Sequence, residues 1–145
     1  MKTLEEFVKS KKNFLVAHRG SSGTAPENTM AAFKEALREN ADMIEADIQL
    51  TADDKVVAIH DKTLDRTSSG EGLVSNKPFE DLNKLDVGSW HDPAFSGLRI
   101  PLLSEIIDLL KDTAYLNIEL KNREGSELTS RIDKILEIIY DKKKK

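Results

Sequence analysis

The chain has 145 residues, of which 33% are charged and 39% hydrophobic, and its formal net charge is −4. This length allows one domain with a hydrophobic core, and the negative charge argues against broad nucleic-acid binding. The absence of cysteine excludes disulfides and thiolate zinc sites, no apolar run is long enough to span a bilayer, and no apolar signal segment starts the chain, so we expect a cytoplasmic protein.

Two helices and two strands are predicted in the first fifty residues. Residues 3–11 form a short helix, because Thr3 and Glu6 have capping-box spacing. A buried strand over 14–18 ends in His18-Arg19-Gly20, and a loop over 21–26 follows. The next helix is capped by Asn28 or Thr29 and ends at Asn40, a residue that tolerates the left-handed conformation. A second strand covers 43–50.

The link between this strand and the next, over 55–60, is too short for a parallel crossover, so the two form an antiparallel hairpin. Residues 61–100 are irregular, with one helical pattern at 79–85. A stretch of this kind in a compact domain indicates an insertion or a functional loop. We expect Trp90 and Phe95 in its small core and His91 on the surface.

Regular structure resumes after Pro101. Ser104 is expected to cap a helix, a strand covers 114–120, and a last helix starts near Ser126. Its apolar positions are Leu128, Ile132, Ile135, Leu136 and Ile139. With the hairpin and the irregular stretch set aside, the order strand–helix occurs three times, which is typical of a parallel α/β fold.

Carboxylates gather near the ends of two of these strands. Side chains two residues apart share one face of a strand, so Glu45 lies beside Asp47, and Glu119 lies between Asn117 and Lys121. Buried carboxylates repel one another unless a cation neutralises them. Oxygen ligands favour Mg²⁺ or Ca²⁺. The alternative is that Lys121 and Arg19 pair with them, or that these faces are exposed to solvent.

Two histidines end neighbouring strands. His18 closes the first strand, and His60 is followed by Asp61 at the end of the hairpin. A pair of histidines beside a metal site suits general acid and base catalysis on an ester. Arg19 and Lys121 would neutralise an anionic substrate.

Six short motifs follow one another along the chain. Their residues and their order, from about residue 14 to 121, resemble those of the glycerophosphodiester phosphodiesterase family. The motifs are His18-Arg19-Gly20, Pro26-Glu27-Asn28-Thr29, Glu45-Ala46-Asp47, His60-Asp61, Ile100-Pro101 and Ile118-Glu119-Leu120-Lys121.

The resemblance implies a TIM barrel and the metal-dependent hydrolysis of glycerophosphodiesters, small-molecule substrates, to an alcohol and glycerol 3-phosphate. It assigns the divalent cation, Mg²⁺ or Ca²⁺, to Glu45, Asp47 and Glu119. It makes His18 and His60 the acid–base pair, places Arg19 and Lys121 on the phosphate, and gives the pocket to Glu27 and Asn28.

The sequence departs from the family in several places. The family usually has glycine where Asn40 and Asp54 stand, and threonine in place of Leu102. A TIM barrel needs eight strand–helix units in roughly 250 residues. Residues 1–145 hold three units plus an insertion over about 50–100, which predicts a partial barrel with an open sheet edge that could self-associate.

Two other interpretations stay open. One is a truncated, inactive α/β module that binds metal or a partner. The other is a related barrel enzyme, such as a phospholipase D-like toxin or a phosphoinositide-specific phospholipase C. The Pro26–Thr29 motif and the insertion that follows His60-Asp61 favour the glycerophosphodiester phosphodiesterase family.

Overall fold

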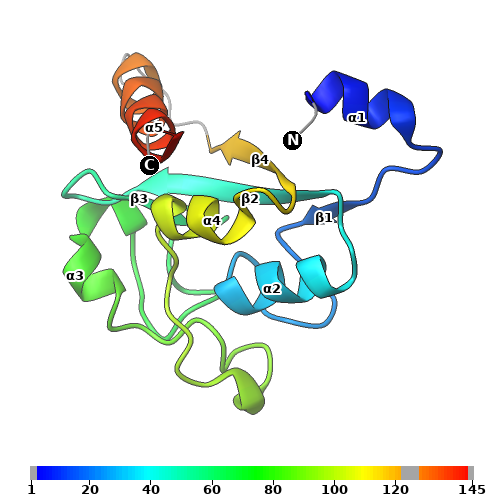
Figure 1. Ribbon diagram of the computed structural model, residues 1–145. Helices are drawn as coiled ribbons and strands as arrows, with labels where there is room; N and C mark the ends of the chain where they lie inside the picture. Colours follow the sequence, from blue (N-terminus) through cyan, green and yellow to red (C-terminus); the bar gives the residue numbers. More distant parts are fainter. Residues whose placement is uncertain (1–2, 122–127, 144–145) are drawn as a thin grey trace.

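A computed structural model describes residues 3–121 and 128–143 of the chain. Four strands form one sheet (Figure 1): β1 (Val16–His18), β2 (Met43–Leu50), β3 (Val56–Ala58) and β4 (Tyr115–Leu120). The α-helices are α1 (Leu4–Ser10), α2 (Met30–Arg38), α3 (Phe79–Leu82), α4 (Leu103–Leu110) and α5 (Leu128–Lys143). Short 3₁₀ helices cover Val74–Asn76 and Pro93–Phe95.

Strand β2 is the centre of the sheet. It pairs in parallel with β1 and with β4, and antiparallel with β3. Residues of β2 that pair with β4 also pair with β1 at one end and with β3 at the other. Therefore β1 and β3 lie end to end along one edge of β2, and β4 occupies the other edge. The predicted hairpin of β2 and β3 is confirmed, and the three parallel strands are β1, β2 and β4.

Three helices cover one face of this sheet, the face that carries Ile44, Ala46 and Ile48. Helices α2 and α4 bury Phe33, Ala36 and Ile106 against Ile44 and Ala46. Helix α5 packs on α4, and its Ile135 joins the cluster around Ile48. Figure 1 shows α4 and α2 lying along β2 and α5 beside β4. The hydrophobic core of the sheet therefore lies on its even-numbered face, and the carboxylates of β2 point to the other.

Polar residues define the ends of the first elements. Thr3 and Glu6 form the expected capping box of α1, and Thr29 Oγ1 accepts a hydrogen bond from the N–H of Ala32 at the start of α2. Asn40 and Asp54 have φ angles of 60° and 61°. These are left-handed conformations that favour glycine, and asparagine and aspartate tolerate them better than other residues with a side chain.

The connection between β3 and α4 has a hydrophobic cluster of its own, made mainly by Val57, Leu64, Val74, Leu82 and Ile100. Trp90 is not part of it. Its side chain is 40% exposed, and its indole N–H donates to the carbonyl of Val87. The expectation that Trp90 fills this core is wrong, because aliphatic side chains already fill it.

Two other expectations at element ends are wrong. Leu15 and Val16 are 53% and 44% exposed, so the first strand is not buried; it is an edge strand in the described part of the chain. Ser104 does not cap α4. The N-cap is Leu102, two residues earlier, so the helix begins at Leu103; the carboxylate of Glu105 accepts a hydrogen bond from the N–H of Leu102 at 2.8 Å.

The last helix starts at Leu128 in the described residues, and Ser126 lies outside them. Of its predicted apolar positions, Ile135 and Ile139 pack inward, whereas Ile132 and Leu136 remain more than one-third exposed. The side chain of Leu128 lies outside the described residues. Within the described ranges, no helix combines the length and apolar character needed to cross a membrane.

Candidate active site

The parallel register brings three carboxylates together. Asp47 lies opposite Glu119 in the β2–β4 pair, and His18 lies opposite Glu45 in the β1–β2 pair. Glu45, Asp47 and Glu119 each offer an oxygen, and these atoms lie within 4.8 Å of one another. The predicted cluster is therefore present, on the sheet face opposite the helices. It lies toward the carboxyl ends of the parallel strands, where barrel enzymes place their sites.

Glu45 is the least compensated member of the cluster. Its Oε2 accepts a hydrogen bond from the backbone N–H of Arg19 at 2.9 Å, and Nε2 of His18 lies 3.9 Å from the same oxygen. Its buried Oε1 has no hydrogen-bond partner in the described part of the chain. Burial raises the pKa of Glu45, and the nearby carboxylates of Asp47 and Glu119 raise it further.

Asp47 is fully buried and is paired with two cations. Arg19 Nε lies 3.1 Å from Oδ2, and Lys121 Nζ lies 2.8 Å from Oδ1. The Asn28 amide donates to Oδ2 at 2.8 Å and accepts from the backbone N–H of Asp47 at 3.1 Å. Burial opposes ionisation, but Lys121 and Asn28 outweigh it and hold the pKa of Asp47 below its usual value.

These contacts decide how far the carboxylates are neutralised without a metal. Arg19 and Lys121 do pair with Asp47, and Lys121 also pairs with Glu119, as the alternative interpretation expected. However, neither cationic side chain forms an ion pair with Glu45 in the described structure. Three carboxylates therefore face two strong cations, and a buried oxygen is left without a partner. An all-oxygen donor set of this kind fits a hard divalent cation such as Mg²⁺ or Ca²⁺.

The two histidines have different surroundings. His18 ends β1 next to Glu45, and its side chain is 65% exposed. His60 follows β3, and its Nδ1 lies 2.6 Å from Asp61 Oδ1. His60 lines a small pocket together with Glu27 and Asn28, the residue whose amide contacts Asp47. The structure thus brings all the sequence-predicted site residues to one region.

Glu27 contacts a residue that the sequence reasoning missed. Its carboxylate accepts hydrogen bonds from Arg19 at 3.0 Å and from Arg66 at 2.8 and 3.0 Å. The Arg66 guanidinium also donates to Asp61 at 2.7 and 3.0 Å. Chiefly because of Arg66, the pKa of Glu27 is lowered. A single arginine in an irregular stretch gave no pattern that could have identified it.

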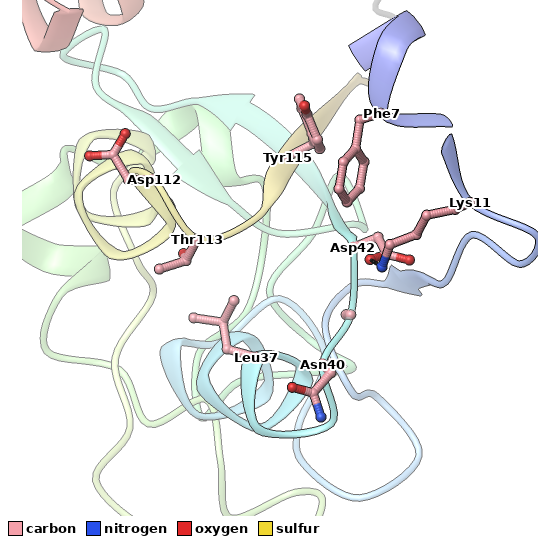
Figure 2. Close-up of a pocket in the computed structure, with 9 residues that line it drawn as sticks. Phe7, Lys11, Leu37, Asn40, Asp42, Asp112, Thr113 and Tyr115 are labelled. Carbon is pink, nitrogen blue, oxygen red and sulfur yellow. Dashed lines mark hydrogen bonds and ion pairs between the residues drawn. The ribbon is translucent and has the colours of Figure 1, made fainter. Parts of the chain in front are cut away.

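A second hollow lies at the opposite, amino-terminal end of the strands. Figure 2 shows Phe7 of α1 beside Tyr115 of β4, with ring centres 5.1 Å apart, and Lys11 beside Asp42. Asp42 also accepts a hydrogen bond from the N–H of Leu15 at 3.0 Å. The ion pair of Lys11 with Asp42 and the contact of Phe7 with Tyr115 anchor α1 to the sheet. None of the predicted site residues lines this hollow.

Comparison with known proteins identifies the pattern. The model of the glycerophosphoryl diester phosphodiesterase family matches residues 18–139. A glycerophosphodiester phosphodiesterase of Caldanaerobacter subterraneus subsp. tengcongensis is 49% identical over 112 residues, which are 77% of this chain and 46% of the relative. One from Bacillus subtilis is 41% identical over 115 residues, 74% of this chain and 39% of the relative. The chain spans about half the length of the curated relatives it matches.

Solved structures agree with this match. A phosphodiesterase from Oleispira antarctica, solved in complex with the product sn-glycerol-3-phosphate, has 37% identity and a TM-score of 0.84 over 88% of this chain and 52% of that one. A glycerophosphodiester phosphodiesterase from Agrobacterium tumefaciens has 37% identity and a TM-score of 0.76, covering 89% and 55%. The expected fold, part of a TIM barrel with three strand–helix units, the hairpin and the long connection, is confirmed.

Proposed function

Because the chain belongs to the glycerophosphoryl diester phosphodiesterase family, we propose that it forms the metal-binding and acid–base part of an enzyme that hydrolyses glycerophosphodiesters. The products are glycerol 3-phosphate and an alcohol. The observation that carries the proposal is the approach of Glu45, Asp47 and Glu119 to within 4.8 Å, next to His18.

Glu45, Asp47 and Glu119 hold one divalent cation, Mg²⁺ or Ca²⁺. The partnerless Oε1 of Glu45 and the surplus of carboxylates over cations at the site support this assignment. When bound, the ion polarises the phosphoryl oxygens and neutralises the charge that develops on them. A cation held there would offset the burial, and the repulsion from Asp47 and Glu119, that raise the pKa of Glu45.

His18 and His60 move the protons. One of them accepts the proton of the glycerol hydroxyl next to the ester, and the hydroxyl oxygen attacks phosphorus to form a cyclic phosphate. The other donates a proton to the departing alcohol oxygen. Water then opens the ring with the two roles reversed. His18 Nε2 lies 3.9 Å from Glu45 Oε2, and His60 lines the small pocket that also includes Asn28, which supports the assignment of both histidines to one site.

Arg19 and Lys121 contact the substrate phosphate, and Glu27 and Asn28 shape the pocket at the first loop. Arg19 is held in the left-handed conformation, with φ of 60°, and donates to Glu27 as well as pairing with Asp47. The positively charged side chains of Arg19 and Lys121 are therefore both held beside the carboxylate cluster, by Asp47, before the substrate binds. Self-association through an open sheet edge remains a prediction.

The test is release of glycerol 3-phosphate from glycerophosphocholine, with Mg²⁺ or Ca²⁺ and again with a chelator. We expect turnover in the presence of the metal ion and none in the presence of the chelator. His18→Ala should bind the metal ion but show no turnover. His91→Ala is the matched control, because His91 contacts Trp90 and Phe95 in the long connection. Unchanged activity in His18→Ala would refute the assigned role.

The same assay separates the enzyme from an inactive module. Metal binding without any turnover would indicate that these residues form a binding module and would overturn the proposed activity of this chain. The family match favours glycerophosphodiesters over the substrates of phospholipase D-like toxins or phosphoinositide-specific phospholipase C.

A further inference from the structure

The side chain of Arg66 joins two loops that flank the site. Its guanidinium donates to Asp61, which follows β3, and to Glu27, which lies in the loop between β1 and α2. Four of its five N–H groups are used in these contacts. Two carboxylates also surround this one positive charge. Arg66 is therefore occupied by protein carboxylates and is poorly placed to bind a substrate phosphate.

Asp61 connects Arg66 to a histidine. Its Oδ1 lies 2.6 Å from His60 Nδ1, and the Arg66 guanidinium contacts both of its oxygens. Hydrogen bonds from Arg66, and then from His60, hold the pKa of Asp61 far below its usual range. An ionised carboxylate only accepts hydrogen bonds. The proton of a neutral His60 ring is therefore on Nδ1, and Nε2 is left free to accept a proton.

The backbone at this point is fixed independently of Arg66. The Gln49 amide group donates to the carbonyls of Ile59, His60 and Asp61 at 3.1, 3.0 and 2.5 Å. Gln49 is buried on β2. Gln49 therefore fixes the main chain at residues 59–61. The loss of Arg66 would free the side chains of Asp61 and His60 to move, while the main chain after β3 keeps its hydrogen bonds to Gln49.

We propose that Arg66 is a positioning residue, which acts through Asp61 to hold the His60 imidazole in the Nδ1–H tautomer and in a fixed orientation. The inference rests on the proposed function in one respect, namely that His60 is one of the two acid–base histidines. The neutral imidazole of a solvated histidine prefers the Nε2–H tautomer, so the contact with Asp61 must select the other one.

The test measures the tautomer directly, without turnover. Long-range ¹H–¹⁵N correlation spectra of the full chain report which ring nitrogen carries the proton. They are recorded at a pH at which the His60 ring is neutral. In the unaltered protein we expect Nδ1–H to predominate. In Arg66→Gln we expect the Nε2–H population to become at least comparable, because Asp61 is no longer held against the ring.

Matched variants separate this effect from a general one. Arg38→Gln removes an arginine of the same charge that pairs with Glu35 on the exposed side of α2, and should leave the His60 spectrum unchanged. Arg66→Lys keeps the charge, but an ammonium group cannot donate two hydrogen bonds to each of Glu27 and Asp61. We therefore expect a tautomer ratio between those of the unaltered protein and Arg66→Gln. Asp61→Ala removes the acceptor itself and is measured if Arg66→Gln does not fold.

Activity supplies the second measurement. Because Arg66 acts on His60 and not on the substrate, kcat should fall by tenfold or more in Arg66→Gln with KM changed less than threefold. An unchanged tautomer in folded Arg66→Gln, or in Asp61→Ala, overturns the proposal. A shifted tautomer in a chain that shows no phosphodiesterase activity would support the positioning role and refute the proposed function, so the two failures are distinguishable.

Discussion

The backbone N–H of Arg19 donates to Glu45 Oε2 at 2.9 Å, and Arg19 holds a φ of 60° at the end of β1. The left-handed turn directs this N–H toward the carboxylate, while the side chain reaches Asp47 and Glu27. One residue thus contacts three carboxylates of the site, and its strained backbone conformation is part of how it does so.

Replacing Arg19 should separate the effect of the side chain from that of the backbone. Arg19→Ala removes a cation partner of buried Asp47 and should lower the free energy of unfolding by about 1–3 kcal/mol. Arg19→Gly loses the same contacts but accepts the positive φ, so it should be about 1 kcal/mol more stable than Arg19→Ala. Urea unfolding of both variants measures the difference. Equal stability would show that the turn is not strained.

Divalent cations should stabilise the folded chain. Binding to the folded state alone adds about 1.4 kcal/mol when the free ion is at ten times its Kd, and thermal unfolding with Mg²⁺, Ca²⁺ or a chelator measures the shift. Glu45→Gln should abolish the metal-dependent rise in Tm. Glu71→Gln removes an exposed carboxylate outside the site and should keep the rise. A rise that persists in Glu45→Gln would place the ion elsewhere.

Acid should weaken the long connection through Asp86. Its carboxylate accepts hydrogen bonds from the backbone N–H groups of Gly97, Ser89 and Gly88 at 2.5, 2.8 and 2.9 Å. These contacts, that of Gly97 first, hold its pKa well below the ordinary value of 3.8. A lowered pKa in the folded state gives stability that is complete above the pKa of the unfolded chain and is lost as the pH falls through the folded-state value.

The comparison of Asp86→Asn with the unaltered protein tests this sign. At pH 7 the variant should have a lower free energy of unfolding than the unaltered protein. This difference should become smaller as the pH is lowered below about 4, because protonation of Asp86 removes the charge that strengthens its hydrogen bonds. Urea unfolding at several pH values gives both curves. A gap that stays constant with pH would mean that the three N–H contacts do not depend on the charge of Asp86.

Two substitutions at Leu102 test what a side-chain acceptor contributes at the start of α4. Glu105 accepts a hydrogen bond from the N–H of Leu102, but Leu102 has no side-chain oxygen to complete a capping box. Leu102→Thr and Leu102→Ala both lose the contact of Leu102 with the cluster of the long connection. Only threonine supplies the missing acceptor, so it should be more stable than alanine by about 1 kcal/mol. Thermal unfolding of the pair checks this.

The chemistry of the strands could be predicted from the sequence because it depends on simple periodicity. Alternation along β2 and β4, and the rule that parallel strands end at the same edge, were enough to place Glu45, Asp47 and Glu119 together. The left-handed conformation of Asn40 agrees with its residue type, and that of Asp54 agrees with a position at which the family usually has glycine. The roles assigned to these residues, and the boundaries expected for the insertion, stay predictions.

The rest depends on contacts that no local pattern encodes. Arg66 bridges Glu27, 39 residues away, to Asp61, and only the path of the long connection brings them together. The exposure of Leu15 and Trp90 depends on which neighbours cover them. The start of α4 was misplaced because Ser104 is a good cap by composition, whereas the hydrogen bond between Glu105 and Leu102 decides the position.

The division of β2 and β4 into a helix-covered face and a carboxylate face also has a consequence for substitutions. Substitutions at Ile44, Ile48 or Ile118 alter the core, whereas a change at exposed Asn117 alters the surroundings of the carboxylates and leaves the helix contacts in place. A change at Asn117 can therefore alter the surroundings of the carboxylates in a single step, without disturbing the core that the helices cover.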